Sequence, residues 1–428
     1  MNILIFTNTF TPHVGGVARS VVAFTEEYRQ RGHRVLVVAP EFSDMPKHEL
    51  DVVRVAAIQN FNASDFSVAL PPIAGLGERL DDFKPDIVHS QHPFLLGMTA
   101  LRIARYRDLP LVFTHHTLYE QYTHYVPGDS PAMKRFAIEL ATRYANLCDQ
   151  VFAPSESVQE LLHTRGVTTP IAVVPTGVRL ENFAHGDGHT VRQDMGIPAS
   201  AFVVGHLGRL APEKNLEFLS QAVADFVGHC PEAHFLVIGT GPSEAAMRSI
   251  FARTGAASRL HVTGILQQQQ LTDALHAMNV FVFASRSETQ GMVLIEAMAA
   301  GLPVVALDAP GVREVVEDGK NGRLLPEETP AAFSAALQWL TALPAENMRA
   351  LQQAARDTAE AFSMSRAADK ALACFAAIKS RSAAGASEDE RDWLDVLVWL
   401  KTEWDILKSV AGAGDAAMGA SQSSAKGE

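Results

Sequence analysis

Short apolar runs alternate with amphipathic helical stretches along most of this chain, and this alternation constrains the fold more than any other feature. The runs are rich in β-branched and aromatic residues, which is typical of buried strands. Strands that alternate with helices predict two parallel, doubly wound sheets. The expected strands lie at 2–7, 34–40, 86–91, 111–116, 150–155 and 171–177 in the first half, and at 202–209, 234–241, 260–264, 279–284 and 303–306 in the second.

The length of 428 residues is too great for one ordinary domain. It fits two Rossmann-like halves with additional C-terminal material. We expect an N-terminal domain over 1–185 and a second domain over 190–365, with the polar, glycine-containing segment 182–201 as the linker. Ligands of such folds bind beyond the carboxyl ends of the strands, so we expect a site in a cleft between the two domains.

Composition argues against several classes of function. The net charge of −12 disfavours a nucleic-acid partner, because such binding rests on phosphate neutralisation by lysine and arginine. The three cysteines are widely spaced and form no CxxC or zinc pattern, which indicates a reducing compartment. The N-terminus lacks a basic, apolar signal segment, and no run reaches the ~20 apolar residues of a membrane span. We therefore expect a cytoplasmic protein, free or peripheral on a membrane.

The segment 285–301, SRSETQGMVLIEAMAAG, combines two carboxylates with a turn and the start of a helix. Gly291 supplies the turn, and the residues from Met292 onward are good helix formers. A helix N-terminus presents unpaired N–H groups that can hold a phosphate without a metal. Glu288 in the turn and Glu296 within the helix could then bind other parts of the ligand, such as sugar hydroxyls. Alternatively, both glutamates are solvated charges stabilised by the helix dipole.

A pair of cations follows the first strand of the second half, in the sequence HLGRLAPEKN. Arg209 and Lys214 lie five residues apart in a loop that can wrap back on a ligand. Two fixed cations there could neutralise a diphosphate leaving group, a task that a divalent ion performs in other enzymes. No DxD-like carboxylate cluster occurs in a suitable loop, so no metal is expected. The alternative is a pair of surface loop charges.

The first half carries weaker signals. Gly15 and Gly16 lie in the turn between the first strand and the first helix, where the backbone can approach a phosphate or sugar closely, and a purely structural turn is the alternative.

Histidines gather at the ends of two neighbouring strands. They could bind zinc, but no cysteine and no evident fourth ligand joins them, so hydrogen-bonded histidines are the alternative. The residues concerned are His89, His92, His115, His116 and His124.

Together these motifs resemble the retaining family 4 glycosyltransferases of the GT-B fold. The resemblance rests on the spacing of Glu288 and Glu296, on the EAMAAG helix that follows, and on a Gly-Arg pair with Lys214 a short gap later. It implies a metal-independent hexosyltransferase with two Rossmann-like domains that face a cleft. It also implies that a helix at 366–380 crosses back to pack on the first domain.

The resemblance assigns roles to the site residues. His116 would hydrogen-bond the transferred sugar, although His115 stands where relatives usually have an aromatic residue. Glu288 would hold the hexose, Glu296 the ribose, and Arg209 with Lys214 the phosphates, while backbone groups at 263–266 would read the base. Residues implied to contact the nucleotide sugar are Gly15, Gly16, Arg209, Lys214, Thr263, Gly264, Ile265, Glu288, Gly291, Met292, Val293 and Glu296.

A narrower resemblance comes from ETQG, which replaces the commoner E-(S/G)-F-G, together with HHTLYEQYTHYVP and QHPFLLG. These are similar to the bacterial diacylglycerol glycosyltransferases. This implies transfer of glucose or another hexose from a nucleotide sugar, such as UDP-glucose, to a diacylglycerol acceptor at the inner face of the cell membrane. The alternatives are a soluble sugar or polyol acceptor, GDP-mannose as the donor, and a non-catalytic nucleotide-binding module.

Two segments could meet a membrane or a partner. Residues 381–410 predict a linker and an amphipathic helix with Trp393, Trp399 and Trp404. This helix could dock on the protein itself, on a second subunit or at a membrane, although its acidic polar face disfavours anionic lipid. Residues 411–428 are expected to be disordered.

In the first half, a helix from Met98 carries three arginines among apolar residues and is either a membrane-docking face or an ordinary surface helix. These are Arg102, Arg105 and Arg107.

Overall fold

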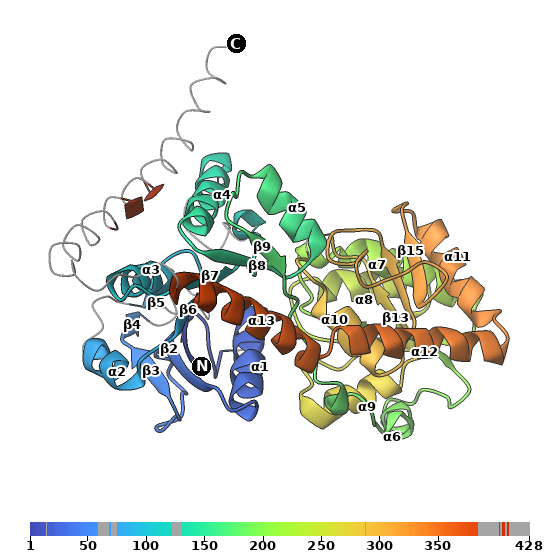
Figure 1. The fold of residues 1–428 in the computed structure, drawn as a ribbon. Helices are drawn as coiled ribbons and strands as arrows, with labels where there is room; N and C mark the ends of the chain where they lie inside the picture. Colours follow the sequence, from blue (N-terminus) through green and yellow to red (C-terminus); the bar gives the residue numbers. More distant parts are fainter. Residues whose placement is uncertain are drawn as a thin grey trace, which may run out of the picture. The chain divides into compact units, whose positions relative to one another are not determined.

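We analysed a computed structural model of the chain, which describes residues 1–13, 15–58, 68–69, 75–121, 130–286 and 288–383, together with 402, 405, 406, 409 and 410. The chain divides into two compact units. Unit 1 comprises Met1–Pro175 and Ala367–Glu428, and unit 2 comprises Thr176–Arg366. Each unit contains a parallel sheet with helices on both faces, which confirms the expected fold class (Figure 1). The first boundary falls earlier in the chain than the expected position at 185.

The large sheet of unit 1 has seven strands in the order β3-β2-β1-β6-β7-β8-β9, all parallel. The strand order reverses between β1 and β6, and doubly wound sheets bind ligands at such a switch point. The strands are β1 (Asn2–Phe6), β2 (Arg34–Pro40), β3 (Val52–Val55), β6 (Ile87–Ser90), β7 (Leu111–Thr114), β8 (Gln150–Ala153) and β9 (Ile171–Val173). A separate antiparallel pair consists of β4 (Ala57–Ile58) and β5 (Val68–Ala69).

Helices cover both faces of this sheet. One apolar cluster joins the strands to α2 (Leu76–Phe83), α3 (Leu96–Tyr106), α4 (Pro131–Asn146) and α5 (Glu156–Thr164). The helices α1 (Gly16–Gln30) and α13 (Met364–Ala383) lie together and are joined by a contact between the rings of Tyr28 and Phe375. Phe375 also packs against His89 and Phe152, so α13 returns the end of the chain to unit 1 (Figure 1).

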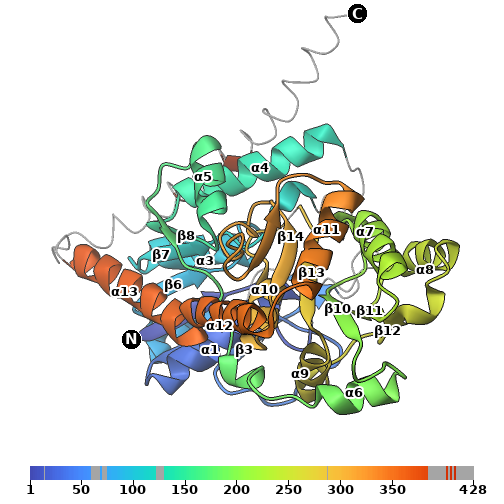
Figure 2. The same ribbon diagram turned by 90° about the vertical axis from the view of Figure 1, so that its right-hand side faces the viewer.

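The sheet of unit 2 has six parallel strands in the order β12-β11-β10-β13-β14-β15, with its switch point between β10 and β13. Its strands are β10 (Phe202–Leu207), β11 (Ala233–Ile238), β12 (Leu260–Val262), β13 (Val280–Phe283), β14 (Val304–Leu307) and β15 (Gly322–Leu325). One apolar cluster contains residues of α7 (Leu216–His229), α8 (Glu244–Arg253) and α11 (Pro330–Thr341). A second contains residues of α9 (Gln268–His276) and α10 (Met292–Ala299), and α12 (Ala345–Ala361) packs beside α10 (Figure 2).

The expected linker at 182–201 is wrong, because this segment is a packed part of unit 2. It contains α6 (Gly188–Asp194), and Phe183 and Ile197 are buried in the cluster that includes α9 and α10. A Cβ on Gly188 would lie 2.2 Å from the carbonyl oxygen of His276, so α6 rests directly on the end of α9. The polar composition of the segment concealed this close approach.

Among the described residues of the C-terminal extension, Ile406 packs against unit 1. Thr402, Ile406 and Ser409 are buried, and Ile406 belongs to the apolar cluster of unit 1. The three tryptophans of this segment and the expected disordered tail lie outside the described residues. No helix within the described part of the chain is long and apolar enough to cross a membrane.

Candidate functional site

At the switch point of unit 2, a polar contact joins Lys214 to Glu288. Lys214 ends the short 3-10 turn η5 (Pro212–Lys214) after β10, and Glu288 lies in the loop after β13. Because β10 and β13 are neighbours in the sheet, both loops leave the same edge together. The ammonium of Lys214 donates to Oε1 of Glu288 at 2.5 Å, and the side chains are only 20% and 16% exposed. The two predicted residues therefore form one partly buried ion pair.

The loop that carries Glu288 is built against the backbone of Gly311. Gly311 has a φ of +76°, and a Cβ there would lie 2.9 Å from the carbonyl oxygen of Glu288, so only glycine permits this approach. Gly291 takes the left-handed conformation and caps the N-terminus of α10. The first turn of α10 contains Met292 and Val293, which are half-buried. Glu296 lies further along α10 and is 1% exposed.

The loop with Arg209 is fixed through backbone contacts with the loop after β11. The amide of Gly208 donates to Ile238, and the amide of Leu210 donates to Thr240. Two glycines that the sequence analysis missed make this possible. A Cβ on Gly239 would lie 1.9 Å from the carbonyl oxygen of Gly208, and one on Gly241 would lie 2.3 Å from that of Leu210. The sequence GTG, directly after an expected strand, could have indicated these two glycines. Arg209 itself is exposed at the surface of this loop.

A third loop, after β12, joins the same edge of the sheet. The amide of Gly239 donates to the carbonyl of Gly264 at 2.9 Å, and the amide of Thr263 donates to Val237 at 3.0 Å. Ile265 is 68% exposed and presents an apolar side chain at this edge. The structure thus brings the predicted residues of three loops to one edge of the unit 2 sheet.

His206, within β10, is a buried residue of this site that the sequence analysis did not select. Its Nδ1 lies 3.0 Å from the carbonyl oxygen of Val282, which can only accept, so Nδ1 carries the proton. Burial lowers the pKa of His206 to about 4, and the charge of Lys214 adds to this effect. The imidazole is therefore neutral at pH 7, and its Nε2 is a hydrogen-bond acceptor.

In unit 1, Gly15 ends the turn after β1, and Gly16 is the first residue of α1. Gly15 has an extended conformation and precedes α1, and a Cβ there would lie 3.0 Å from the His13 ring. A Cβ on Gly16 would meet no atom within 4 Å. Neither residue has a left-handed φ, so the backbone conformation does not require glycine at these positions. At Gly16 the missing side chain leaves open space in which a ligand could approach the backbone.

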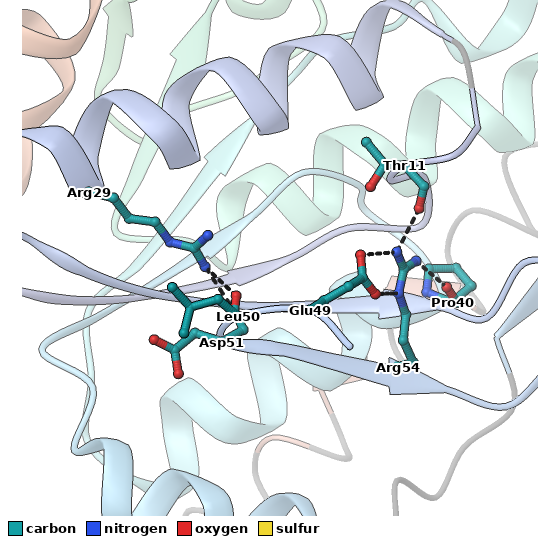
Figure 3. A network of polar contacts seen from close by, with 7 residues as sticks. All are labelled: Thr11, Arg29, Pro40, Glu49, Leu50, Asp51 and Arg54. Atoms are coloured by element: carbon teal, nitrogen blue, oxygen red, sulfur yellow. Dashed lines mark hydrogen bonds and ion pairs between the residues drawn. The ribbon is translucent and has the colours of Figure 1, made fainter. Parts of the chain in front are cut away.

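The segment before these glycines is held by Arg54, which extends from β3 (Figure 3). Its guanidinium donates to the carbonyl oxygens of Thr11 at 2.6 Å and Pro40 at 2.8 Å. Two further bonds, at 2.6 and 2.7 Å, join it to both carboxylate oxygens of Glu49. The guanidinium also lies over the ring of Phe10. Such planar, bidentate bonding fixes the position of the loop and favours arginine over lysine.

The histidines after β6 and β7 separate into different environments. His115 is 1% exposed and packs edge-on against Phe113 and Tyr119. His116 is half-buried, and its Nε2 lies 2.6 Å from Oε1 of Gln91, to which it donates. His116 is therefore the member of the pair nearer to the surface, and its Nδ1 is an acceptor.

Burial keeps these imidazoles neutral. It lowers the pKa of His116 and His92 to about 3, and that of His115 to about 4. His89, whose Nε2 lies 2.7 Å from the hydroxyl of Thr114, also has a pKa of about 3. No group of three or more metal-ligating side chains occurs among the described residues, and His124 lies outside them. A neutral His116 is suited to hydrogen bonding rather than to neutralising an anion.

Two of the three arginines of the segment from Met98 bind the protein's own surface. Arg105 donates to the carbonyl of Leu147 at 2.6 Å, and Arg107 donates to Asp81 at 2.7 Å. Leu101 faces the buried cluster of unit 1. The charge of Arg107 is therefore paired, whereas Arg105 is exposed and keeps its charge.

Comparison with known proteins agrees with these features. Residues 14–182 match the family model Glycosyltransferase Family 4, and residues 201–342 match the model Glycosyl transferases group 1. The chain is 29% identical over 362 residues to an alpha-monoglucosyldiacylglycerol synthase of Streptococcus pneumoniae, covering 82% of this chain and 81% of the relative. It is 31% identical over 337 residues to a GDP-mannose-dependent alpha-mannosyltransferase of Mycobacterium tuberculosis, covering 76% and 84%.

Solved structures show the same fold at low identity. A sucrose-phosphate synthase from Thermosynechococcus elongatus has a TM-score of 0.71 at 20% identity, covering 89% of this chain and 99% of that chain. The Anabaena protein HepE in complex with UDP and glucose has a TM-score of 0.68 at 21% identity, covering 88% and 99%. With both family models matched in order along two Rossmann-like units, this chain is a family 4 glycosyltransferase of the GT-B fold.

Proposed function

We propose that the protein transfers glucose from UDP-glucose to diacylglycerol, with retention of configuration and without a metal. The transfer reaction is supported by the Lys214–Glu288 pair at the switch point of unit 2, beside the N-terminus of α10. The acceptor is supported by the similarity to two alpha-monoglucosyldiacylglycerol synthases, at 29% and 28% identity. Because diacylglycerol stays in the bilayer, the enzyme would act as a peripheral protein at the inner face of the cell membrane.

In the proposed reaction, the bond between the hexose C1 and the β-phosphate oxygen breaks, and the acceptor hydroxyl oxygen bonds to C1 on the same face. The acceptor proton passes to the departing phosphate oxygen. Arg209, Lys214 and the amides of the first turn of α10 would meet the charge that develops on the phosphate, as preorganised partners. No protein nucleophile is needed in this scheme.

The carboxylates would position the donor. Glu288 would accept hydrogen bonds from the hexose hydroxyls, and Glu296 would bind the ribose. The backbone at Thr263 and Gly264, with Ile265 beside it, would contact the base. His116, neutral and with Nδ1 as an acceptor, would hydrogen-bond the transferred hexose.

Thermal-shift measurements with UDP-glucose, UDP-galactose, UDP-glucuronate and GDP-mannose test the donor. A ligand at 100 times its dissociation constant stabilises the protein by about 2.7 kcal/mol. The selected donor is then supplied with diacylglycerol in vesicles or with soluble sugars and polyols. Lipid product that requires vesicles supports the proposal, and transfer to soluble acceptors alone contradicts it.

A second candidate, mannosyl transfer from GDP-mannose, is favoured by one observation. Relatives from Mycobacterium tuberculosis and Mycolicibacterium smegmatis that bear this description are 31% and 29% identical. Stabilisation by GDP-mannose but not by UDP-glucose in the same screen would select this candidate.

A further inference from the structure

The side chain of Gln290 bonds both backbone polar groups of Thr176, more than a hundred residues away in the chain. The amide of Thr176 donates to Oε1 of Gln290 at 2.7 Å, and Nε2 of Gln290 donates to the Thr176 carbonyl at 2.6 Å. Gln290 is 4% exposed and Thr176 is 5% exposed. An amide side chain in this orientation satisfies both groups at once, since it offers one acceptor and one donor side by side.

Thr176 is the first residue of unit 2, where the chain has just left unit 1. Its neighbours pair with the segment through which the chain returns. The amide of Val178 donates to Phe362, and the amide of Met364 donates to Val178. A Cβ on Gly177 would lie 2.3 Å from the Cα of Met364. The outgoing and returning segments are thus packed together, and we call residues 176–178 and 362–364 the crossing segments.

Gln290 belongs to the same loop as Glu288, only two residues later. That loop is otherwise held by the Lys214 ammonium and by the close approach of Gly311. A Cβ on Gly311 would also lie 2.9 Å from the backbone nitrogen of Gln290. Because these contacts leave the loop little freedom to move, a displacement of Thr176 would also displace Gln290 and, with it, the carboxylate of Glu288.

This contact depends on a residue at which the chain departs from the common pattern E-(S/G)-F-G. A phenylalanine at position 290 could fill the space but could form neither hydrogen bond. The pair of hydrogen bonds between Gln290 and Thr176, which we call the clamp, therefore depends on the ETQG sequence of this chain.

We propose that Gln290 is a positioning residue that couples the Glu288 loop to the crossing segments. A donor bound by Lys214 and Glu288 would then reduce the mobility of Thr176. Because such coupling is reciprocal, a change that increases the mobility of Thr176 would lower the affinity for the donor. The proposal rests on donor binding at Glu288 and Lys214, and is independent of the acceptor.

The variant Gln290→Met removes both bonds and retains the length of the side chain. Its control, Gln150→Met, removes another buried glutamine whose Nε2 bonds a backbone oxygen, that of Pro170 in unit 1. We expect the KM for UDP-glucose, or for GDP-mannose if the screen selects it, to rise about tenfold in Gln290→Met, equivalent to about 1.4 kcal/mol. The control should keep the wild-type KM. Equal values in both variants would overturn the proposal.

Amide hydrogen exchange supplies a readout that a purely structural role would not move. In the wild type, saturating UDP, or GDP for a GDP-mannose enzyme, should slow the exchange of residues 176–178. This effect should be absent in Gln290→Met and present in Gln150→Met. If the nucleotide binds but leaves exchange at 176–178 unchanged in the wild type, the coupling does not exist. Absence of nucleotide binding in the wild type would instead refute the proposed function.

A second variant, Gln290→Glu, keeps the shape and makes the contact sensitive to pH. The carboxylate can accept from the Thr176 amide but repels the carbonyl oxygen, whereas the protonated acid can donate to it. Burial raises the pKa of such a carboxyl, so the second bond should return as the pH falls. The KM ratio of variant to wild type should therefore decrease from pH 8 to pH 5.5. A ratio that is constant or rises over this range would count against the clamp.

Discussion

Lys214 and Glu288, which lie in the loops after two neighbouring strands, form an ion pair at 2.5 Å. Lys214 and the N-terminus of α10 both lie at this edge of the sheet, where a diphosphate bound in the proposed reaction would meet them. The partial burial of both side chains also strengthens the interaction relative to one in water.

Lys214→Ala should reduce kcat/KM by about 10²-fold or more, because it removes one preorganised partner of the leaving phosphate. EDTA should not inhibit the wild type if the cations perform the task of a metal. Steady-state kinetics with and without EDTA measure both effects. Lys320→Ala is the control, since Lys320 forms an exposed pair with Glu317 in the same unit. Inhibition by EDTA that Mg²⁺ or Mn²⁺ reverses would refute the metal-free assignment.

Gly16→Ala tests whether the donor approaches the N-terminus of α1. A Cβ there meets no atom within 4 Å, so the folded protein should keep its stability to within about 0.5 kcal/mol. If the donor phosphate lies against this backbone, the added methyl group should raise the KM for the donor. Thermal unfolding and donor kinetics separate the two effects. An unchanged KM would place the donor away from Gly16.

Arg54→Met should destabilise the protein by about 3–5 kcal/mol, because it leaves the partly buried carboxylate of Glu49 without its partner and removes the bonds to Thr11 and Pro40. Arg54→Lys should be only partly tolerated, since an ammonium cannot reproduce the bidentate contact. Arg79→Met provides the comparison. Arg79 pairs with Asp51 at a more exposed position, and its loss should cost about 0–1 kcal/mol. Urea unfolding of the three variants would show the expected order, and similar losses for Arg54→Met and Arg79→Met would contradict it.

The sequence was sufficient to predict the fold because apolar strands and amphipathic helices have different periods, and these patterns are local. The parallel sheets of both units follow this expectation. Segments whose packing depends on close backbone contact were harder to assign. The polar residues of the segment with α6 predict a linker, and nothing in their sequence indicates the close contact between Gly188 and His276. The strand β15, with the sequence GRLL, was missed because it is short and interrupted by a charge.

For the site, the sequence indicated residues but not their partners. Lys214 and Glu288 were assigned to separate parts of the ligand, and their direct contact follows only from the order of strands in the sheet. The contact of Gln290 with Thr176 and that of Arg54 with Thr11 join distant parts of the chain and have no local signal. His206 was overlooked because a single histidine within an apolar strand resembles ordinary core.

His115→Phe should make the protein less sensitive to acid. Burial holds the pKa of His115 at about 4, against 6.5 for an ordinary histidine, so the unfolded chain binds a proton more readily than the folded protein. The stability contributed by the neutral imidazole is present above pH 6.5 and is lost as the pH falls toward 4. At pH 5 the loss from this one residue should be about 2 kcal/mol. Phenylalanine fits the aromatic surroundings of Phe113 and Tyr119 and does not titrate.

Urea unfolding at pH 7 and pH 5 measures this effect for the wild type and for His115→Phe. The variant should lose less stability between the two values, while the other buried histidines retain their contribution in both proteins. His163→Gln, at an exposed position on α5, should keep the pH dependence of the wild type. If His115→Phe loses as much stability as the wild type, then His115 is not held neutral in the folded protein.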